Sequence, residues 1–227
     1  MKTAIAKRES GIGAGRLAMV LIAGALLGGC SILGGNKTPS TIYAPDPRVQ
    51  ADPSWPAVDW QLTLSPPTAG RMVDSQRIAV RPTPGELQVY KGAVWAKSPS
   101  EQVTDTVLHA LEDSGKIPAV ARQGSGITAD YKLVMDLRRF EADYAGAAVP
   151  KATIEVSAKL LHASDQDIAA SHIFLQAVPA ASTDVAAVTQ AFDQALGMIG
   201  RDITGWILSS GDAHEHSGAH SAKRKPN

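Results

Sequence analysis

The sequence has a single cysteine among its 227 residues, which excludes a disulfide within the chain and a metal site built from several thiolates. It also lacks an excess of either charge, because 22 basic residues balance 22 acidic ones. Proteins that bind phosphate backbones carry a basic surplus, so we expect no nucleic-acid partner. Aromatic residues make up only 5% of the chain.

The first thirty residues have the pattern of a secretion signal. Residues 1–16 carry four basic side chains against one acidic side chain, and residues 17–27 form an apolar run. A run of this length is too short to cross a bilayer but fits the core of a signal peptide. The sequence LGGC at 27–30 then resembles the lipobox of bacterial lipoproteins. We predict a lipoprotein signal peptide over residues 1–29 and lipid attachment at Cys30.

The residue after this cysteine indicates the destination of the chain. Ser31 is typical of lipoproteins that continue to the outer membrane, whereas Asp at this position favours the inner membrane. Several acyl chains, palmitate among them, anchor a protein firmly because each buried methylene contributes about 0.8 kcal/mol. We therefore expect Cys30 to anchor the mature chain at the periplasmic face of the outer membrane.

Composition divides the mature chain into three parts. Residues 30–59 are rich in Gly, Pro, Ser and Asp without an apolar period, which predicts a flexible, lipid-anchored tether. Residues 209–227 contain no aliphatic side chain larger than Ala, and we predict a disordered, His-rich and basic tail. The segment 60–208 is long enough to bury a core and forms the predicted domain.

The first half of this domain predicts short strands followed by a helix. Alternating apolar residues favour a strand at 76–81, and two further short strands are expected at 87–90 and 93–97. The sequence SPSE at 98–101 matches a capping box with Pro at the first helical position. A helix should begin there and end at Gly115, where a left-handed conformation is useful.

The second half predicts an antiparallel meander of three strands. Apolar side chains alternate from Tyr131 onward, and their parity shifts between Leu137 and Phe140, which indicates a β-bulge. A second strand is expected through 154–160 and a third over about 168–178, joined by a polar turn.

A long amphipathic helix is expected to close the domain. Its apolar residues recur every three or four positions from Val185 to Trp206. Gly197, Gly200 and Gly205 each weaken such a helix by about 1 kcal/mol relative to Ala, so we expect them to permit close packing. The pattern predicts an α+β fold, a two-layer sandwich with two helices packed on one face of a mostly antiparallel sheet.

Catalytic chemistry has little support in this domain. Its only histidines are His109, His162 and His172, and none lies in a motif with a nucleophile. The G-x-S-x-G motif of serine hydrolases is absent. We interpret these histidines as structural residues and expect neither a catalytic site nor a cofactor.

The tail holds the best cluster of metal ligands by spacing. It consists of Asp212, His214, Glu215, His216 and His220. Ordering a flexible tail around a metal ion opposes binding through the loss of chain entropy. We therefore assign no metal site, although such a His-rich segment can capture zinc or nickel weakly.

A longer stretch of the domain has the pattern of a known family. The run SPPTAGRMVDSQRIAVRPTPGELQVYKGAVW at 65–95 combines a strand ending in Val-Arg with Tyr90 and Trp95, and it precedes the capped helix. Together with the lipobox and the closing helix, it resembles the ABC-type transport auxiliary lipoprotein family, whose best-known type is paraquat-inducible protein C. The family often has Arg where this chain has Val94, so no contact of that arginine is carried over.

The resemblance implies a mechanical role. Members look like outer-membrane components of systems in which an inner-membrane ABC transporter works with a mammalian-cell-entry (MCE) domain protein to move lipids. It implies that this chain docks the distal end of the MCE component, in a homo-oligomeric ring, while ATP is hydrolysed elsewhere. Tyr90 and Trp95 are the candidate contacts, because large aromatic residues with a polar edge suit interfaces. Burial in the core is the alternative interpretation of both residues.

Two other functions stay open at this point. A lipid carrier would hold an acyl chain in its own apolar cavity, of which the low aromatic content and small Ala and Val residues give no sign. A periplasmic hydrolase or metal-binding lipoprotein would need an activated nucleophile or a ligand cluster.

Overall fold

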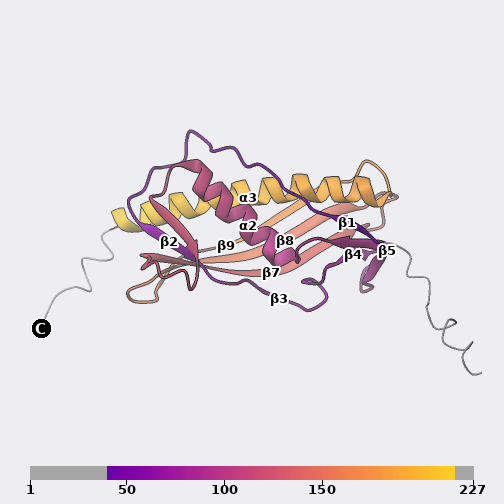
Figure 1. Ribbon diagram of the computed structural model, residues 1–227, viewed down its shortest axis with the longest axis horizontal. Helices are drawn as coiled ribbons and strands as arrows, with labels where there is room; N and C mark the ends of the chain where they lie inside the picture. The colour runs from indigo at the N-terminus through magenta and orange to yellow at the C-terminus, as the bar shows by residue number, and fades with distance from the viewer. Residues whose placement is uncertain (1–39, 218–227) are drawn as a thin grey trace, which may run out of the picture. The chain divides into compact units, whose positions relative to one another are not determined.

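The computed structural model describes residues 40–217 of the chain. Its strands are β1 (Thr41–Tyr43), β2 (Gln61–Leu64), β3 (Thr68–Ala69), β4 (Arg77–Arg81), β5 (Gln88–Trp95), β6 (Ala119–Arg122), β7 (Tyr131–Asp143), β8 (Lys151–His162) and β9 (Ile168–Pro179). Its helices are α2 (Pro99–Ser114) and α3 (Val185–His216) (Figure 1). Neither of these helices has the length and apolar character needed to cross a membrane.

The longest strands form the expected antiparallel meander. β7 pairs with β8 from end to end, and β8 pairs with β9 over nearly its full length. One side of β8 carries Ile154, Val156, Ala158 and Leu160, which are all completely buried. The period-two pattern of the sequence therefore reports the buried face of these strands correctly.

The expected β-bulge is confirmed in β7. The register with β8 shifts between Leu137 and Arg139, so Arg138 is the additional residue. The shift lets both Leu137 and Phe140, each 1% exposed, face the core despite their odd spacing.

The shorter strands add parallel pairings that the sequence pattern does not reveal. β2, β3 and β4 each run parallel to β7, β6 runs parallel to β2, and β1 runs parallel to β5. The long ladders remain antiparallel, so the sheet is mixed, and the α+β class is confirmed. The expectation of two strands at 87–90 and 93–97 is wrong, because β5 is one strand that passes through Gly92 at a positive φ of 68°.

The capping signals of α2 are confirmed. The Ser98 hydroxyl accepts a hydrogen bond from the Glu101 amide at 3.4 Å, and the Glu101 carboxylate accepts one from the Ser98 amide at 2.8 Å. Gly115 ends the helix in the left-handed conformation. Both ends of α2 are therefore determined by local sequence.

The expectation of a disordered tail from residue 209 is wrong as far as residue 216. Helix α3 continues to His216, because its last turns pack on the domain. The Tyr131 hydroxyl lies 2.8 Å from His214 Nδ1 and 2.7 Å from a carboxylate oxygen of Glu215. Gly211 is buried against the Trp60 ring. The rest of the predicted tail, 218–227, lies outside the described residues.

The expectation of a flexible tether is wrong for residues 40–59. Strand β1 joins the sheet, and Trp55 is buried against the domain with 8% of its surface exposed. The Arg201 guanidinium of α3 binds the Asp52 carboxylate at 2.6 Å. The Val58 amide donates to the Lys116 carbonyl at 2.8 Å. Proline and glycine content does not reveal this packing, because only a few residues of the segment are large and buried, and these make the contacts with the domain. The earlier part of the predicted tether lies outside the described residues.

The glycines of α3 permit close packing, as expected, and their neighbours explain why. A Cβ atom at Gly200 would lie 2.5 Å from Thr106 Cγ2 of α2. A Cβ atom at Gly205 would lie 2.6 Å from Trp55 Nε1. The glycines therefore admit α2 and the segment before β2, rather than the sheet.

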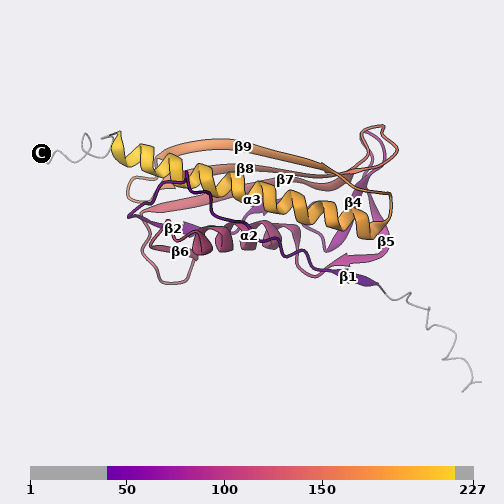
Figure 2. The ribbon, with the colours of Figure 1, turned by 90° about the horizontal axis from the view of Figure 1, so that it is seen from above.

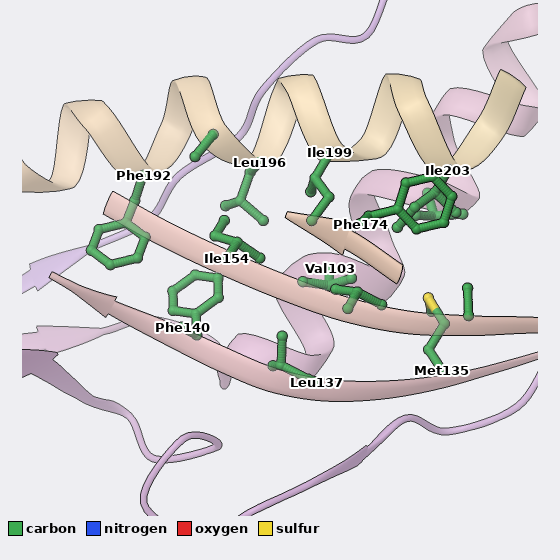
Figure 3. Packing of buried hydrophobic residues seen from close by; sticks show 14 of the residues in the cluster. Val103, Met135, Leu137, Phe140, Ile154, Phe174, Phe192, Leu196, Ile199 and Ile203 are labelled. Atoms are coloured by element: carbon green, nitrogen blue, oxygen red, sulfur yellow. The ribbon is translucent and has the colours of Figure 1, made fainter. Parts of the chain in front are cut away.

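Both helices lie on one side of the sheet and share one core with it. α3 packs on β8 and β9, and α2 packs against α3, beside which it lies in Figure 2. Figure 3 shows side chains of α3 pointing toward those of the strands, namely Phe192, Leu196, Ile199 and Ile203 against Phe140, Ile154 and Met135. Each such buried side chain stabilises the fold by about 1.5–3 kcal/mol.

Candidate functional site

The least covered apolar surface among the described residues lies on β9. This strand pairs only with β8, so one of its edges has no partner within residues 40–217. Ile173 is 52% exposed and Leu175 is 55% exposed on the face opposite α3, while Phe174 between them is buried. Ile168 at the start of the strand is 57% exposed. We call β9 with these three exposed side chains the β9 surface.

The β9 surface also lacks the usual protection of an edge strand. None of its twelve residues is Lys, Arg, Asp or Glu. Natural proteins generally blunt sheet edges with charges, prolines or short strands, because an open edge can pair with another chain. A long, uncharged edge with exposed aliphatic side chains is therefore suited to binding a protein partner.

Polar residues border the β9 surface on the same face of the sheet. Glu155 lies opposite Leu175 in the β8–β9 register, and Ser157 lies opposite Ile173. Glu155 is 3.6 Å from the bulged Arg138. An apolar centre with a charged rim on one side is the usual anatomy of a protein interface.

A buried ion network lies farther along this face and holds β4 to β7. The Glu141 carboxylate, 2% exposed, accepts hydrogen bonds from Arg81 at 2.8 and 2.9 Å and from Arg139 at 2.8 Å. Burial alone would raise the pKa of Glu141, but the hydrogen bonds from both arginines bring this pKa below its ordinary value. Arg139 also binds Asp143 at 2.5 Å. The network is satisfied internally, so we assign it to stability.

The two predicted contact residues differ in their surroundings. Trp95 is 1% exposed and packs edge-on against Phe140 and Phe192, with ring centroids 5.8 and 5.2 Å apart. Its interpretation as a partner contact is therefore corrected, and Trp95 is a core residue. Tyr90 is half-buried, and burial together with the neighbouring Tyr144 raises its pKa. Its role as a contact stays a prediction, and Cys30 lies outside the described residues.

His162 has a hydroxyl and a carboxylate at the same nitrogen of its ring. His162 Nδ1 lies 3.0 Å from the Ser164 hydroxyl and 3.0 Å from the Asp165 carboxylate. A nucleophile and an orienting carboxylate must use opposite nitrogens of the imidazole, whereas both of these groups reach the same atom. His172 lies against the Phe174 ring at 4.6 Å, and His109 lies on α2.

The described part of the His-rich cluster does not converge on one point. His214 faces the Tyr131 hydroxyl, whereas His216 Nδ1 lies 2.8 Å from the Asp212 carbonyl of its own helix. Within residues 40–217 no group of three or more His, Cys, Asp or Glu side chains is placed to hold a metal ion. Burial and the Glu215 hydrogen bond raise the pKa of Tyr131, which keeps its hydroxyl protonated.

A hollow of about 650 Å³ lies beside the start of α2. Its lining contains Leu64, Pro66 and Pro67, but also five charged side chains, namely Asp74, Lys97, Glu101, Asp105 and Arg122. Asp105 pairs with both Lys97 and Arg122. An acyl chain would have to lie against these charges, so the hollow does not suit one.

Sequence reasoning missed the β9 surface as a site, although it predicted the strand. The available signal was the absence of any charged residue from 168 to 179, together with apolar residues at both parities around Phe174. In a strand with one solvated face, apolar and polar residues normally alternate. The departure from this alternation in β9 indicates a face that also contacts a partner.

Comparison with solved structures finds proteins with a similar fold. A protein of Xanthomonas campestris, whose crystal structure is assigned to family DUF330, is 54% identical to this chain and superposes with a TM-score of 0.76. That match covers 78% of this chain and 99% of the other. An uncharacterized protein of known structure shares the fold at a TM-score of 0.56 and 11% identity, with coverage of 73% and 97%.

Among curated proteins, an uncharacterized protein of Bradyrhizobium diazoefficiens is 25% identical over 185 residues, or 81% of this chain. The match spans about half the length, 49%, of that relative. The fold is that of an α+β domain in which the uncharged strand β9 has no partner along one edge within residues 40–217. The family described as the ABC-type transport auxiliary lipoprotein component matches residues 41–204, and this chain belongs to it. The resemblance seen in the sequence is thereby confirmed.

Proposed function

We propose that this chain is the outer-membrane lipoprotein subunit of an ABC transport system that moves lipids, and that it docks a periplasm-spanning MCE-domain protein at the outer membrane. Family membership supports an auxiliary role beside an ABC transporter. The lipobox at Cys30 and the following Ser31 support anchoring at the outer membrane. The docking role rests on one observation, the uncovered β9 surface.

The β9 surface offers two kinds of contact to such a partner. Its free edge presents main-chain amides and carbonyls over twelve residues, which can extend the sheet by one strand of the partner. Ile173 and Leu175 add an apolar centre that loses water on contact. The charged rim of Arg138 and Glu155 would fix the orientation of the partner rather than supply most of the affinity.

In this account the chain itself is a binding protein and not an enzyme. ATP is hydrolysed by the transporter, and this subunit supplies a fixed position for the distal end of the conduit. The arrangement of Ser164, His162 and Asp165 around a single imidazole nitrogen supports this proposal, because it does not activate a nucleophile. Several copies of the chain in a ring would present several β9 surfaces to one MCE assembly.

The alternative of an acyl carrier receives less support from the described residues. A carrier needs an enclosed apolar cavity, whereas the hollow beside α2 is lined by five charged side chains. The core between the helices and the sheet is filled by large side chains such as Phe140, Phe192 and Trp95. We therefore retain docking as the proposed function.

Chemical crosslinking in intact cells tests the proposal. The lipoprotein is expressed at its native level as bait, crosslinked, extracted with detergent and analysed by mass spectrometry. Wild type is compared with Cys30→Ala, which removes the anchor, and with Leu175→Asp, which places a charge in the β9 surface. Met72→Asp is the matched control, because Met72 is also an exposed apolar residue, at 50%, outside β9.

We expect wild type and Met72→Asp to recover an MCE-domain protein at similar levels. Leu175→Asp should recover at least several-fold less, because a charge desolvated in an apolar interface strongly opposes binding. Cys30→Ala should also recover less, because the protein no longer remains at the outer membrane. Recovery of copies of this chain alone, with no MCE-domain protein in any sample, would exclude the docking proposal.

A further inference from the structure

Two turns of the domain come together at one end of the sheet. β4 and β7 run parallel, with Val80 opposite Ala142. The turns that follow these strands therefore leave the sheet at the same end. These turns are residues 82–87 and residues 144–150. The Tyr144 amide donates to the Arg81 carbonyl at 3.1 Å, which joins the two turns at their base. We call these two turns the tip of the domain.

The described chain also enters the domain from the side of the tip. β1 runs parallel to β5, with Thr41 opposite Ala93, so the chain before Thr41 points toward the earlier residues of β5. Those residues lead back to the turn 82–87, because β5 is antiparallel to β4. Figures 1 and 2 show β1, β4 and β5 at the same end of the domain, away from the last turns of α3.

Covalent geometry limits how far the tip can lie from a lipid anchor. Ten residue steps separate Cys30 from Ser40, and a chain of this length spans at most about 36 Å. The thirteen residues of β7 alone extend over about 40 Å from the far end of the domain to the tip. An anchor at Cys30 therefore brings the tip to the bilayer more readily than the opposite end.

The chemistry of the tip suits a lipid surface. The turn 144–150 contains no charged residue, whereas the turn 82–87 contains one, the exposed Glu86. Ala145, Ala147 and Ala148 are exposed. Val149 is half-buried in the same turn. Small apolar side chains form no hydrogen bonds with water. On an exposed turn they can enter the region between the head groups and the acyl chains of a bilayer.

Polar groups at the margin of the tip complete the pattern of a membrane interface. Tyr144 begins the turn that follows β7 and is half-buried. Tyrosines favour the head-group level, because the ring is apolar and its hydroxyl is polar. Lys91 and Lys151 are exposed on either side, where their ammonium groups can meet phosphate groups.

We propose that the tip, residues 82–87 and 144–150, rests directly on the lipid surface and sets the orientation of the domain on the membrane. The β9 surface then runs away from the bilayer, because β9 ends at Pro179 near the tip and begins at the far end. The proposal rests on the proposed lipid anchor at Cys30.

Depth-dependent fluorescence quenching tests the orientation. Acylation occupies Cys30, so one introduced cysteine gives the mature protein a single free thiol for an environment-sensitive fluorophore. Ala147→Cys places the label in the tip, and Ser125→Cys places it in an exposed turn near the start of β7, at the far end. Full-length acylated proteins are reconstituted in vesicles of phosphatidylethanolamine and phosphatidylglycerol, with and without a lipid brominated in its acyl chains.

We expect about a twofold loss of emission at position 147 and none at position 125, since interfacial segments enter the bilayer by only about 5–10 Å. Quenching at both positions, at neither, or at position 125 alone would overturn the proposal. Flotation of the vesicles separates this outcome from failure of the anchor, because a protein without acyl chains would not float with them. Val149→Asp should reduce the quenching at position 147, and circular dichroism shows whether this variant remains folded.

Discussion

Glu141 is the residue whose burial has the largest electrostatic consequence. Its carboxylate is 2% exposed and receives hydrogen bonds from Arg81 and Arg139, which are themselves about one third exposed at 29% and 30%. Removing one partner of a buried ion network leaves the other charges without compensation, which costs about 3–5 kcal/mol. The single carboxylate therefore joins β4 to β7 in addition to the short ladder between these strands.

Replacing this carboxylate by an amide tests its contribution. Glu141→Gln should lower the free energy of unfolding by about 3 kcal/mol, because Arg81 loses the carboxylate that it binds and Arg139 keeps only Asp143, while the shape is conserved. Urea denaturation followed by circular dichroism measures the change. The matched control is Glu155→Gln, whose ion pair with Arg138 is partly exposed and should contribute no more than about 1 kcal/mol. Equal effects of the two substitutions would contradict this account.

The same carboxylate predicts a pH dependence of stability. The pKa of Glu141 is lowered from its ordinary 4.5 in the folded state, so the unfolded state binds a proton more readily. The stabilisation is present above pH of about 5 and is lost as the pH falls through the folded pKa. Between pH of about 5 and 3, the unfolding free energy of wild type should fall more steeply than that of Glu141→Gln. Parallel curves would show that Glu141 does not titrate differently on folding.

Helix α3 combines residues of low helix propensity with close tertiary packing. Its four glycines weaken the helix, but Gly200, Gly205 and Gly211 lie where a Cβ atom would meet another part of the domain. The sequence predicted the helix, and it predicted close packing at Gly197, Gly200 and Gly205 but not at Gly211. It could not identify the partners, because Thr106, Trp55 and Trp60 are distant in the chain and carry no periodic signal.

Substitution by alanine should change the stability of the domain in opposite directions at two glycines of α3 that lie about one turn apart. At Gly200 the new methyl would be 2.5 Å from Thr106 Cγ2, and such overpacking costs about 1–3 kcal/mol. At Gly197 it would be 3.4 Å from the Pro47 side chain, so the helix-propensity gain of about 1 kcal/mol should prevail. Thermal melts should show a lower Tm for Gly200→Ala and an unchanged or higher Tm for Gly197→Ala. Thr106→Ser removes the methyl group of Thr106 and keeps its hydroxyl. Combined with Gly200→Ala, it should raise the Tm back toward that of wild type.

The last two turns of α3 depend on Tyr131 rather than on their own composition. Residues 209–216 are small and polar, so composition predicted disorder, whereas the Tyr131 hydroxyl contacts both His214 and Glu215. Tyr131→Phe should lower the unfolding free energy by about 1–2 kcal/mol. It should also accelerate hydrogen exchange in residues 212–216 while leaving the middle of α3 protected. Unchanged exchange in these residues would show that the hydroxyl does not hold the helix end.

At the scale of the whole molecule, the sequence predicted the architecture better than the site. Periodicity identified the β7–β9 meander, the bulge before Phe140 and both helices, because each depends on residues close in sequence. The candidate contact Trp95 was wrong, because aromatic residues have the same signature in a core and at an interface. The β9 surface became visible only when the sheet order showed that its strand has one unpaired edge.

The domain therefore carries two different surfaces at two places. The tip lies near the entry of the chain, and its turn 144–150 is uncharged with small side chains. The β9 surface is long, apolar and without protecting charges. A lipid-anchored subunit that positions a partner needs such a separation, because one surface must meet the bilayer while the other remains accessible. Family membership supports a transport system as the setting for this division.

The most direct test of the docking account is site-specific photocrosslinking in intact cells. A photoreactive amino acid is introduced at Leu175 in the β9 surface, and at Met72 as an equally exposed control. The account predicts an ultraviolet-dependent adduct between position 175 and an MCE-domain protein, identified by mass spectrometry, and no such adduct at position 72. If position 175 yields no adduct with an MCE-domain protein while the lipoprotein is anchored and folded, the β9 surface is not the docking site.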